Sequence, residues 1–128
     1  MSGIDECLLE AMTLPGARGA ALVEWISGLT LGVIGEAPGG DHEEVAAQTA
    51  EYARSTAEHA VFTAGNTDGG PPIEDVVVVT ASDYHLLRFL EAPYEGGVFL
   101  HLWLDRAQAN LALALLRLRD LAERLVLV

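Results

Sequence analysis

Histidines are the side chains in this sequence that most invite a chemical role, and two of them have acids nearby. His42 is followed by Glu43 and Glu44, and His101 is followed by Asp105. A protein metal site needs about three or four such ligands, held in place by further hydrogen bonds. Neither segment offers that number at a suitable spacing. The sequence therefore predicts no metal site, with His42 solvated in the first turn of a helix and His101 in a strand beside the core.

The other reactive groups are equally isolated. Cys7 lies on the apolar side of a predicted helix, where cysteine usually packs as a small hydrophobic residue. Ser27 lacks the surrounding glycines of a nucleophile elbow. The chain contains no lysine, which excludes lysine-dependent phosphate sites and Schiff-base chemistry. We expect no catalytic, cofactor-binding or metal-binding residue and no enzymatic activity, since a small enzyme would depend on scattered His, Asp and Glu.

The charge balance excludes further classes of partner. Nineteen acids face seven arginines, which gives a net charge of −12. Such a surface repels nucleic-acid phosphates and anionic membranes and attracts basic protein surfaces. No apolar run is long enough to cross a bilayer. With one cysteine and no secretory N-terminal pattern, we expect a cytoplasmic protein with a single domain over residues 1–128.

The element that should organise the fold is the valine run at 76–79, inside a predicted strand over 73–81. Its residues do not alternate between apolar and polar, so the strand should be covered on both faces, by this chain or by another. The segment 98–104 has the same two-sided apolar character. Further strands are predicted at 20–26, 29–34 and 84–91, with Ser27-Gly28 as a tight hairpin turn.

Helical spacing of apolar residues predicts three helices. They cover residues 4–12 with Ser2 as the N-cap, 42–64 after Asp41, and about 106–125 after Asp105. Loops are predicted at 66–72 and 92–97. The fold class is therefore α/β of the α+β kind, a single five-stranded antiparallel sheet with helices on both faces, in the order α-β-β-α-β-β-β-α.

This order resembles the Roadblock family, the dynein-light-chain-like domains. Several local features carry the resemblance: the Leu14-Pro15-Gly16 entry into the first strand, the Ser27-Gly28 hairpin, the long helix over 44–64, and the last three strands and helix. The match extends over almost the whole chain. The chain departs from the family pattern in its loop around 65–72 and in its acidic balance.

The resemblance implies a dimer with itself or with a related Roadblock subunit, which regulates or scaffolds a small Ras-like GTPase in bacterial, particularly actinobacterial, signalling. Similar proteins act as GTPase-activating partners in bacterial polarity. Because the family pairs its second helix and third strand across a two-fold axis, the implied interface residues are Val45, Thr49, Tyr52, Thr56, Val76, Val78 and Thr80.

Three alternatives stay open at this stage. A PAS-like or profilin-like sensor of small ligands shares the same architecture and predicts an apolar pocket with a few polar groups. Glu44, Glu51 and Glu58 form either a docking face for a basic partner or a solvated helix face. Trp25 and Trp103 are either interface anchors or core residues.

Overall fold

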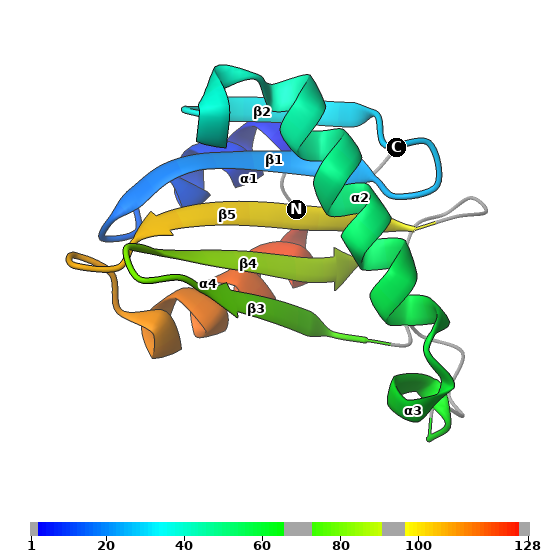
Figure 1. Cartoon of the computed structure of the whole chain (residues 1–128). Coiled ribbons are helices and arrows are strands. Elements are labelled where there is room, and N and C mark those ends of the chain that lie inside the picture. Colours follow the sequence, from blue (N-terminus) through cyan, green and yellow to red (C-terminus); the bar gives the residue numbers. More distant parts are fainter. Residues whose placement is uncertain (1–2, 66–72, 91–96, 126–128) are drawn as a thin grey trace.

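The computed structural model describes residues 3–65, 73–90 and 97–125 (Figure 1). Its main elements follow the predicted order, which confirms the fold class. The bounds are α1 Ile4–Ala11, β1 Ala17–Glu24, β2 Thr30–Gly35, the short 3-10 helix η1 Pro38–Gly40, α2 His42–Glu58, α3 Ala60–Thr63, β3 Asp75–Val79, β4 Asp83–Leu90, β5 Val98–Asp105 and α4 Leu111–Arg124. The predicted cap Ser2 and the predicted loops at 66–72 and 92–96 lie outside the described residues.

All five strands join one antiparallel sheet in the order β2-β1-β5-β4-β3. The centre of the sheet is β5, and every residue from Val98 to Leu104 is buried, as its two-sided apolar sequence predicts. The valine strand β3 is instead an edge strand. Val77 and Val79 are 37 % and 51 % exposed. Of the two expected ways to cover β3, the described residues of this chain do not supply full cover, because β5 takes the central position; cover by another chain stays a prediction.

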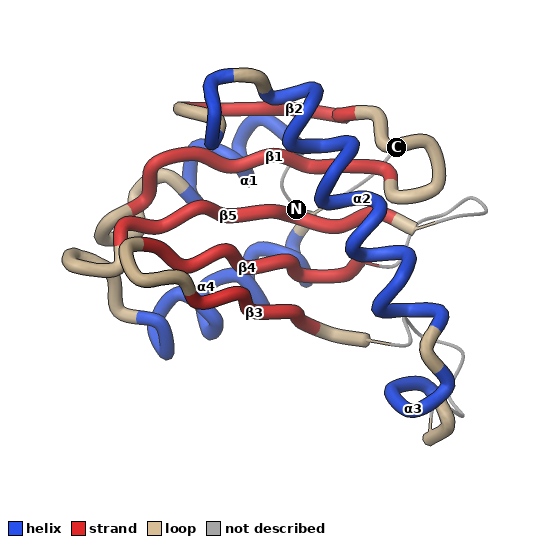
Figure 2. Tube along the Cα trace, viewed as in Figure 1, coloured by secondary structure: helices blue, strands red, loops and turns tan. Residues whose placement is uncertain are grey.

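Helices cover both faces of the sheet (Figures 1 and 2). On one face, α1 and α4 pack through Leu8, Ala11, Leu118 and other apolar residues against the core side of β1, β4 and β5. The fit is close: a Cβ placed on Gly32 of β2 would lie 2.7 Å from the Ile4 Cγ2 atom of α1. This face holds the larger apolar core.

Among the described helices, α2 covers the other face, which we call the α2 face. Ala46, Ala50 and Ala53 are almost fully buried and bring the helix close to the sheet, over Val23, Leu87, Phe89 and Phe99. Figure 1 shows α2 crossing the sheet obliquely, so that none of the described helices lies over the start of β4 and the end of β5 on this face. This uncovered part of the face positions the candidate site.

Several predicted boundaries are corrected. The second helix ends at Glu58 because His59 has extended backbone angles, and α3 forms a separate turn after it. Asn110, whose side chain accepts from the Leu113 amide, caps α4 in place of Asp105. The β1–β2 turn spans more than Ser27-Gly28, since β1 ends at Glu24. Among the described residues, no helix combines the length and apolar character needed to cross a bilayer.

Candidate functional site

Four of the predicted interface residues lie along one flank of α2, beside its buried alanines. Val45, Thr49 and Thr56 are half-buried, and Tyr52 is exposed. The Thr49 hydroxyl donates to the Val45 carbonyl oxygen at 2.8 Å, and the Thr56 hydroxyl donates to that of Tyr52 at 2.9 Å. Because both hydroxyl protons are used within the helix, this flank presents methyl groups and an aromatic ring to its surroundings.

The β3 edge lies at the far side of the same sheet. Hydrogen bonds from Phe89 N to Glu74 O and from Thr80 N to Asp83 O fix which β3 residues bond to β4. Since bonding alternates along an antiparallel pair, the backbone groups of Asp75, Val77 and Val79 point outward. Among the described strands none pairs with this edge.

The side chains of Val76 and Val78 point to the α2 face, because they stand opposite Leu87 and His85. Both are half-buried. Thr80 differs from the expectation that it belongs to the strand. Its hydroxyl accepts from the Asp83 amide at 2.9 Å, which holds the turn between β3 and β4 and ends β3 at Val79.

An ion pair holds β3 onto the sheet. The Arg88 guanidinium donates to the Asp75 carboxylate at 2.8 Å, and the two side chains are 12 % and 21 % exposed. A partly buried charge-assisted hydrogen bond is stronger than a surface pair. The edge strand is therefore fixed in position although its outer backbone groups have no partner among the described strands.

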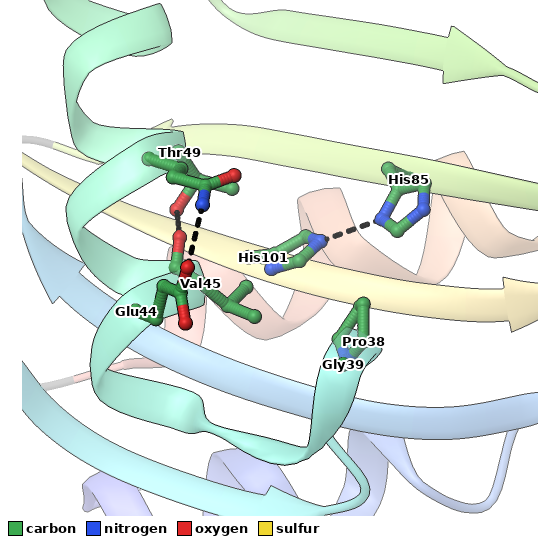
Figure 3. Close-up of a pocket in the computed structure, with 8 residues that line it drawn as sticks. Pro38, Gly39, Glu44, Val45, Thr49, His85 and His101 are labelled. Carbon is green, nitrogen blue, oxygen red and sulfur yellow. Dashed lines mark hydrogen bonds between the residues drawn. The ribbon is translucent and has the colours of Figure 1, made fainter.

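A cleft of about 310 Å³ opens between α2 and the uncovered part of the sheet. Figure 3 shows it bounded by Glu44, Val45 and Thr49 of α2, by Pro38 and Gly39 of η1, and by two histidines on the sheet. Its lining is completed by Gln48, whose amide donates to the Glu44 carboxylate at 3.2 Å. The side of α2 predicted to form an interface therefore also forms a wall of this cleft.

The two histidines are His85 of β4 and His101 of β5, and they are hydrogen-bonded to each other. Their Nδ1 and Nε2 atoms are 3.0 Å apart, while the ring centroids are 5.2 Å apart. The rings therefore meet edge to edge and share one proton. Burial lowers the pKa of His101 from 6.5 to about 3, helped by the charges of His85 and His42. Burial also lowers the pKa of His85, so the pair is uncharged at neutral pH.

Both tryptophans pack on the α2 face, where Trp103 is buried and Trp25 is half-buried. Trp103 is buried below the Arg18 guanidinium, whose central carbon is 3.9 Å from the ring centre, and it lies parallel to the His85 ring. Trp25 makes an edge contact with Phe89. Their packing supports the sheet beside the cleft.

The remaining reactive residues, His42 and Cys7, contribute to the fold through a hydrogen bond and through packing. His42 bonds the Gly35 carbonyl oxygen through Nε2 at 3.0 Å and so fixes the start of α2, which makes it less solvated than expected. Cys7 is buried, and burial raises the pKa of its thiol, as expected for a packed cysteine. Within residues 3–65, 73–90 and 97–125, no group of three His, Cys, Asp or Glu could hold a metal ion.

Sequence reasoning considered His101 beside Asp105 and did not single out His85. Asp105 instead accepts from the Ala107 amide in the turn after β5. The histidines meet because Leu87 stands opposite His101 in the β4–β5 register, which makes His85 a diagonal neighbour. The spacing of residues along the sequence does not fix which residues of β4 and β5 stand opposite each other. No signal in the sequence therefore predicted the contact between His85 and His101.

Comparisons with known proteins agree on the fold. No family model matches the chain, and no curated protein matches it significantly. The structure of Myxococcus xanthus MglB superposes with a TM-score of 0.77 at 18 % identity, covering 94 % of this chain and 82 % of MglB. A Roadblock/LC7 domain from Streptomyces avermitilis gives 0.71 at 20 % identity, covering 95 % and 93 %.

A third similar structure is the gliding protein MglB from Thermus thermophilus, with a TM-score of 0.68 at 21 % identity and coverage of 93 % and 87 %. At such low identities, the similarity concerns the fold and not the activity. The chain therefore has the Roadblock/LC7 fold, which confirms the resemblance predicted from its sequence.

Proposed function

We propose that this Roadblock-fold protein is a non-enzymatic dimer that binds and regulates, or scaffolds, a small Ras-like GTPase. The observation that carries the proposal is that β3 has a free edge among the described strands and that the half-apolar flank of α2 lies on the same face of the sheet as Val76 and Val78. An unpaired edge strand with exposed valines is a ready template for pairing with another chain.

Pairing two copies through β3 would cover both the free edge of β3 and the half-apolar flank of α2. A two-fold axis near Val77 brings the outward backbone groups of Asp75, Val77 and Val79 against those of a second copy. The sheet then continues from one protomer into the other, and no β3 edge is left exposed. A related Roadblock subunit with the same edge is the other candidate partner.

Two features support a small GTPase as the partner: the Roadblock fold and the negative charge of α2. Glu43, Glu51 and Glu58 on α2 are exposed and form no ion pair within the described residues. Such a helix attracts a partner with a basic surface. The proposed mechanism is positional: the dimer contacts the mobile switch segments of the GTPase and shifts them towards one conformation. No residue of this chain is assigned a catalytic role.

The test begins with the mass in solution, measured by light scattering at several protein concentrations. We expect the wild type to be a dimer and Val78→Arg to be a monomer, because the substitution places a charge beside the β3 edge. Leu116→Arg is the matched control, since Leu116 is 63 % exposed on α4, on the opposite side of the sheet. It should leave the mass unchanged.

Binding is then measured with purified small Ras-like GTPases, first with one encoded beside the gene for this protein, in the GDP and GTP-analogue forms. We expect the wild type and Leu116→Arg to bind with the same affinity and to distinguish the two nucleotide states. A wild type that stays monomeric at high concentration contradicts the dimer and favours a small-ligand sensor. A stable dimer that binds no GTPase in either state contradicts the proposed partner.

A further inference from the structure

The cleft beside α2 contains a buried polar group with unused bonding capacity. His101 is 4 % exposed and bonds His85 through Nε2, while its Nδ1 atom has no bond to any described residue. In Figure 3 the second nitrogen of the His101 ring lies on the side that faces Val45 and Pro38. The His101 side chain as a whole is buried, and its Nδ1 atom can accept or donate a hydrogen bond according to the tautomer of the ring. The Nδ1 atom is therefore available to a ligand in the cleft.

The polar side-chain atoms that α2 contributes to the cleft are acceptors. The Glu44 carboxylate and the Gln48 carbonyl oxygen accept hydrogen bonds, and the Gln48 amide is already directed at Glu44. The Thr49 hydroxyl has its proton directed at the Val45 and Ala46 carbonyl oxygens, so towards the cleft it can only accept. A ligand that satisfies these atoms must carry several donors.

The charge of the cleft restricts the ligand further. Glu44 supplies the carboxylate of the cleft, whereas burial lowers the pKa of both His85 and His101 and keeps these rings uncharged at neutral pH. Glu44 forms no ion pair with a described residue. The nearby Arg18 is held by Glu36 and Asp83 and covers Trp103. The cleft is thus a negatively charged site that no cation of the described residues fills.

We propose that the cleft receives the guanidinium group of an arginine side chain from the bound partner protein. The arginine donates to the Glu44 carboxylate, to the Gln48 and Thr49 oxygens near the rim, and to His101 Nδ1 at the floor. The inference rests on the proposed function, since the arginine belongs to the protein that docks on the α2 face. It adds the residue type that this surface recognises.

Arginine fits this site better than lysine does. Its planar guanidinium carries five donors in a fixed fork, which can reach a carboxylate and a ring nitrogen at the same time. The edge-to-edge histidine pair offers a flat floor of matching shape. A lysine ammonium is a compact point charge that is more strongly hydrated. The cleft should therefore prefer arginine.

The shared proton supplies a specific readout. One proton lies between His85 Nδ1 and His101 Nε2, and two tautomeric states are possible. Binding of a donor at His101 Nδ1 requires that atom to be unprotonated, so the shared proton then belongs to His101 Nε2. The ¹⁵N shift of His101 Nδ1 reports this state directly. A merely structural histidine pair would not respond to the ligand.

The test titrates the full chain with N-acetyl-L-arginine amide and follows the ring nitrogens of His101 by NMR at neutral pH. We expect a saturable shift of Nδ1 to the unprotonated value. Glu44→Gln should weaken this response at least about tenfold, because a charge-assisted hydrogen bond is lost. Glu6→Gln is the control: Glu6 is exposed on α1, which packs on the opposite face of the sheet, and the substitution should leave the response of His101 unchanged.

Three results would overturn the inference. They are no saturable change at His101, an equal response to the uncharged N-acetyl-L-citrulline amide, and an equal response in Glu44→Gln. If the protein is a dimer that binds a GTPase but His101 does not respond to the arginine probe, only the proposed arginine site in the cleft is refuted. A monomer whose His101 responds refutes the proposed dimer alone. Conversion of Glu44→Gln to a monomer would show that the arginine comes from a second copy and overturn the assigned source.

Discussion

Acidification should destabilise this protein well before its carboxylates titrate, because of the histidine pair at the floor of the cleft. His101 is buried, and its pKa falls from 6.5 to about 3 in the folded chain. In the unfolded chain the ring recovers its ordinary pKa and binds a proton first. A group with a depressed pKa in the folded state leaves stability intact above pH 6.5 and removes it as the pH falls from 6.5 towards 3.

The magnitude follows from proton linkage. Below its unfolded pKa each such histidine removes about 1.4 kcal/mol of unfolding free energy per pH unit. Because the pKa of His101 is lowered from 6.5 to about 3 in the folded chain, acidification from pH 7.5 to 5.0 removes about 2 kcal/mol of unfolding free energy at this residue. The pKa of His85 is lowered too, which acts in the same direction. The pKa values of Glu10 and Asp83 are lowered from 4.5 and 3.8, so these acids contribute only at lower pH.

The assay is urea unfolding at fixed protein concentration, followed by far-UV circular dichroism at several pH values from 7.5 to 5.0. The wild type should lose about 2 kcal/mol across this range, and His101→Gln should lose much less. His59→Gln is the control, because His59 is an exposed residue at the end of α2. Its pH dependence should follow the wild type.

Two results would refute the reasoning. A wild type whose unfolding free energy is constant between pH 7.5 and 5.0 would show that His101 is not held neutral by burial. Equal slopes for the wild type and His101→Gln would show that another group carries the dependence. The decisive quantity is the change of the unfolding free energy with pH, and not its value at one pH, because removal of a buried ring also changes stability at neutral pH.

Two packing predictions concern the α2 face and its surroundings. Gly97→Ala should cost about 2 kcal/mol or more, since the added Cβ would overlap the indole ring of Trp25. Gly3→Ala is the control, because a Cβ at Gly3 meets nothing within 4 Å, and chemical denaturation measures both. Ala50→Leu should cost about 1–3 kcal/mol by forcing α2 off the sheet, whereas Ala47→Leu on the exposed side should be nearly neutral. Equal unfolding free energies for the two variants of either pair would contradict the packing described for it.

Much of the fold was predictable because it depends on local pattern. The run Val98–Leu104 identifies a doubly covered strand because it is apolar apart from His101, and it is the central strand. The apolar spacing in α1 and α4 identifies the faces that meet the sheet. Asp41 marks the start of α2, where its side chain accepts from the amides of Glu43 and Glu44. Each of these signals lies within a few residues of the feature it predicts.

The sequence by itself determined the order of the elements, their amphipathic faces and the absence of lysine chemistry, because side-chain periodicity and composition carry that information directly. Only the tertiary structure decided that β3 lies at the edge, since two strands with similar apolar runs compete for the centre and the longer one, apolar from Val98 to Leu104 apart from His101, takes it. It also decided that His85 meets His101. Pairing of distant strands depends on register and chain connection, and neither is encoded in the spacing of the residues that it brings together.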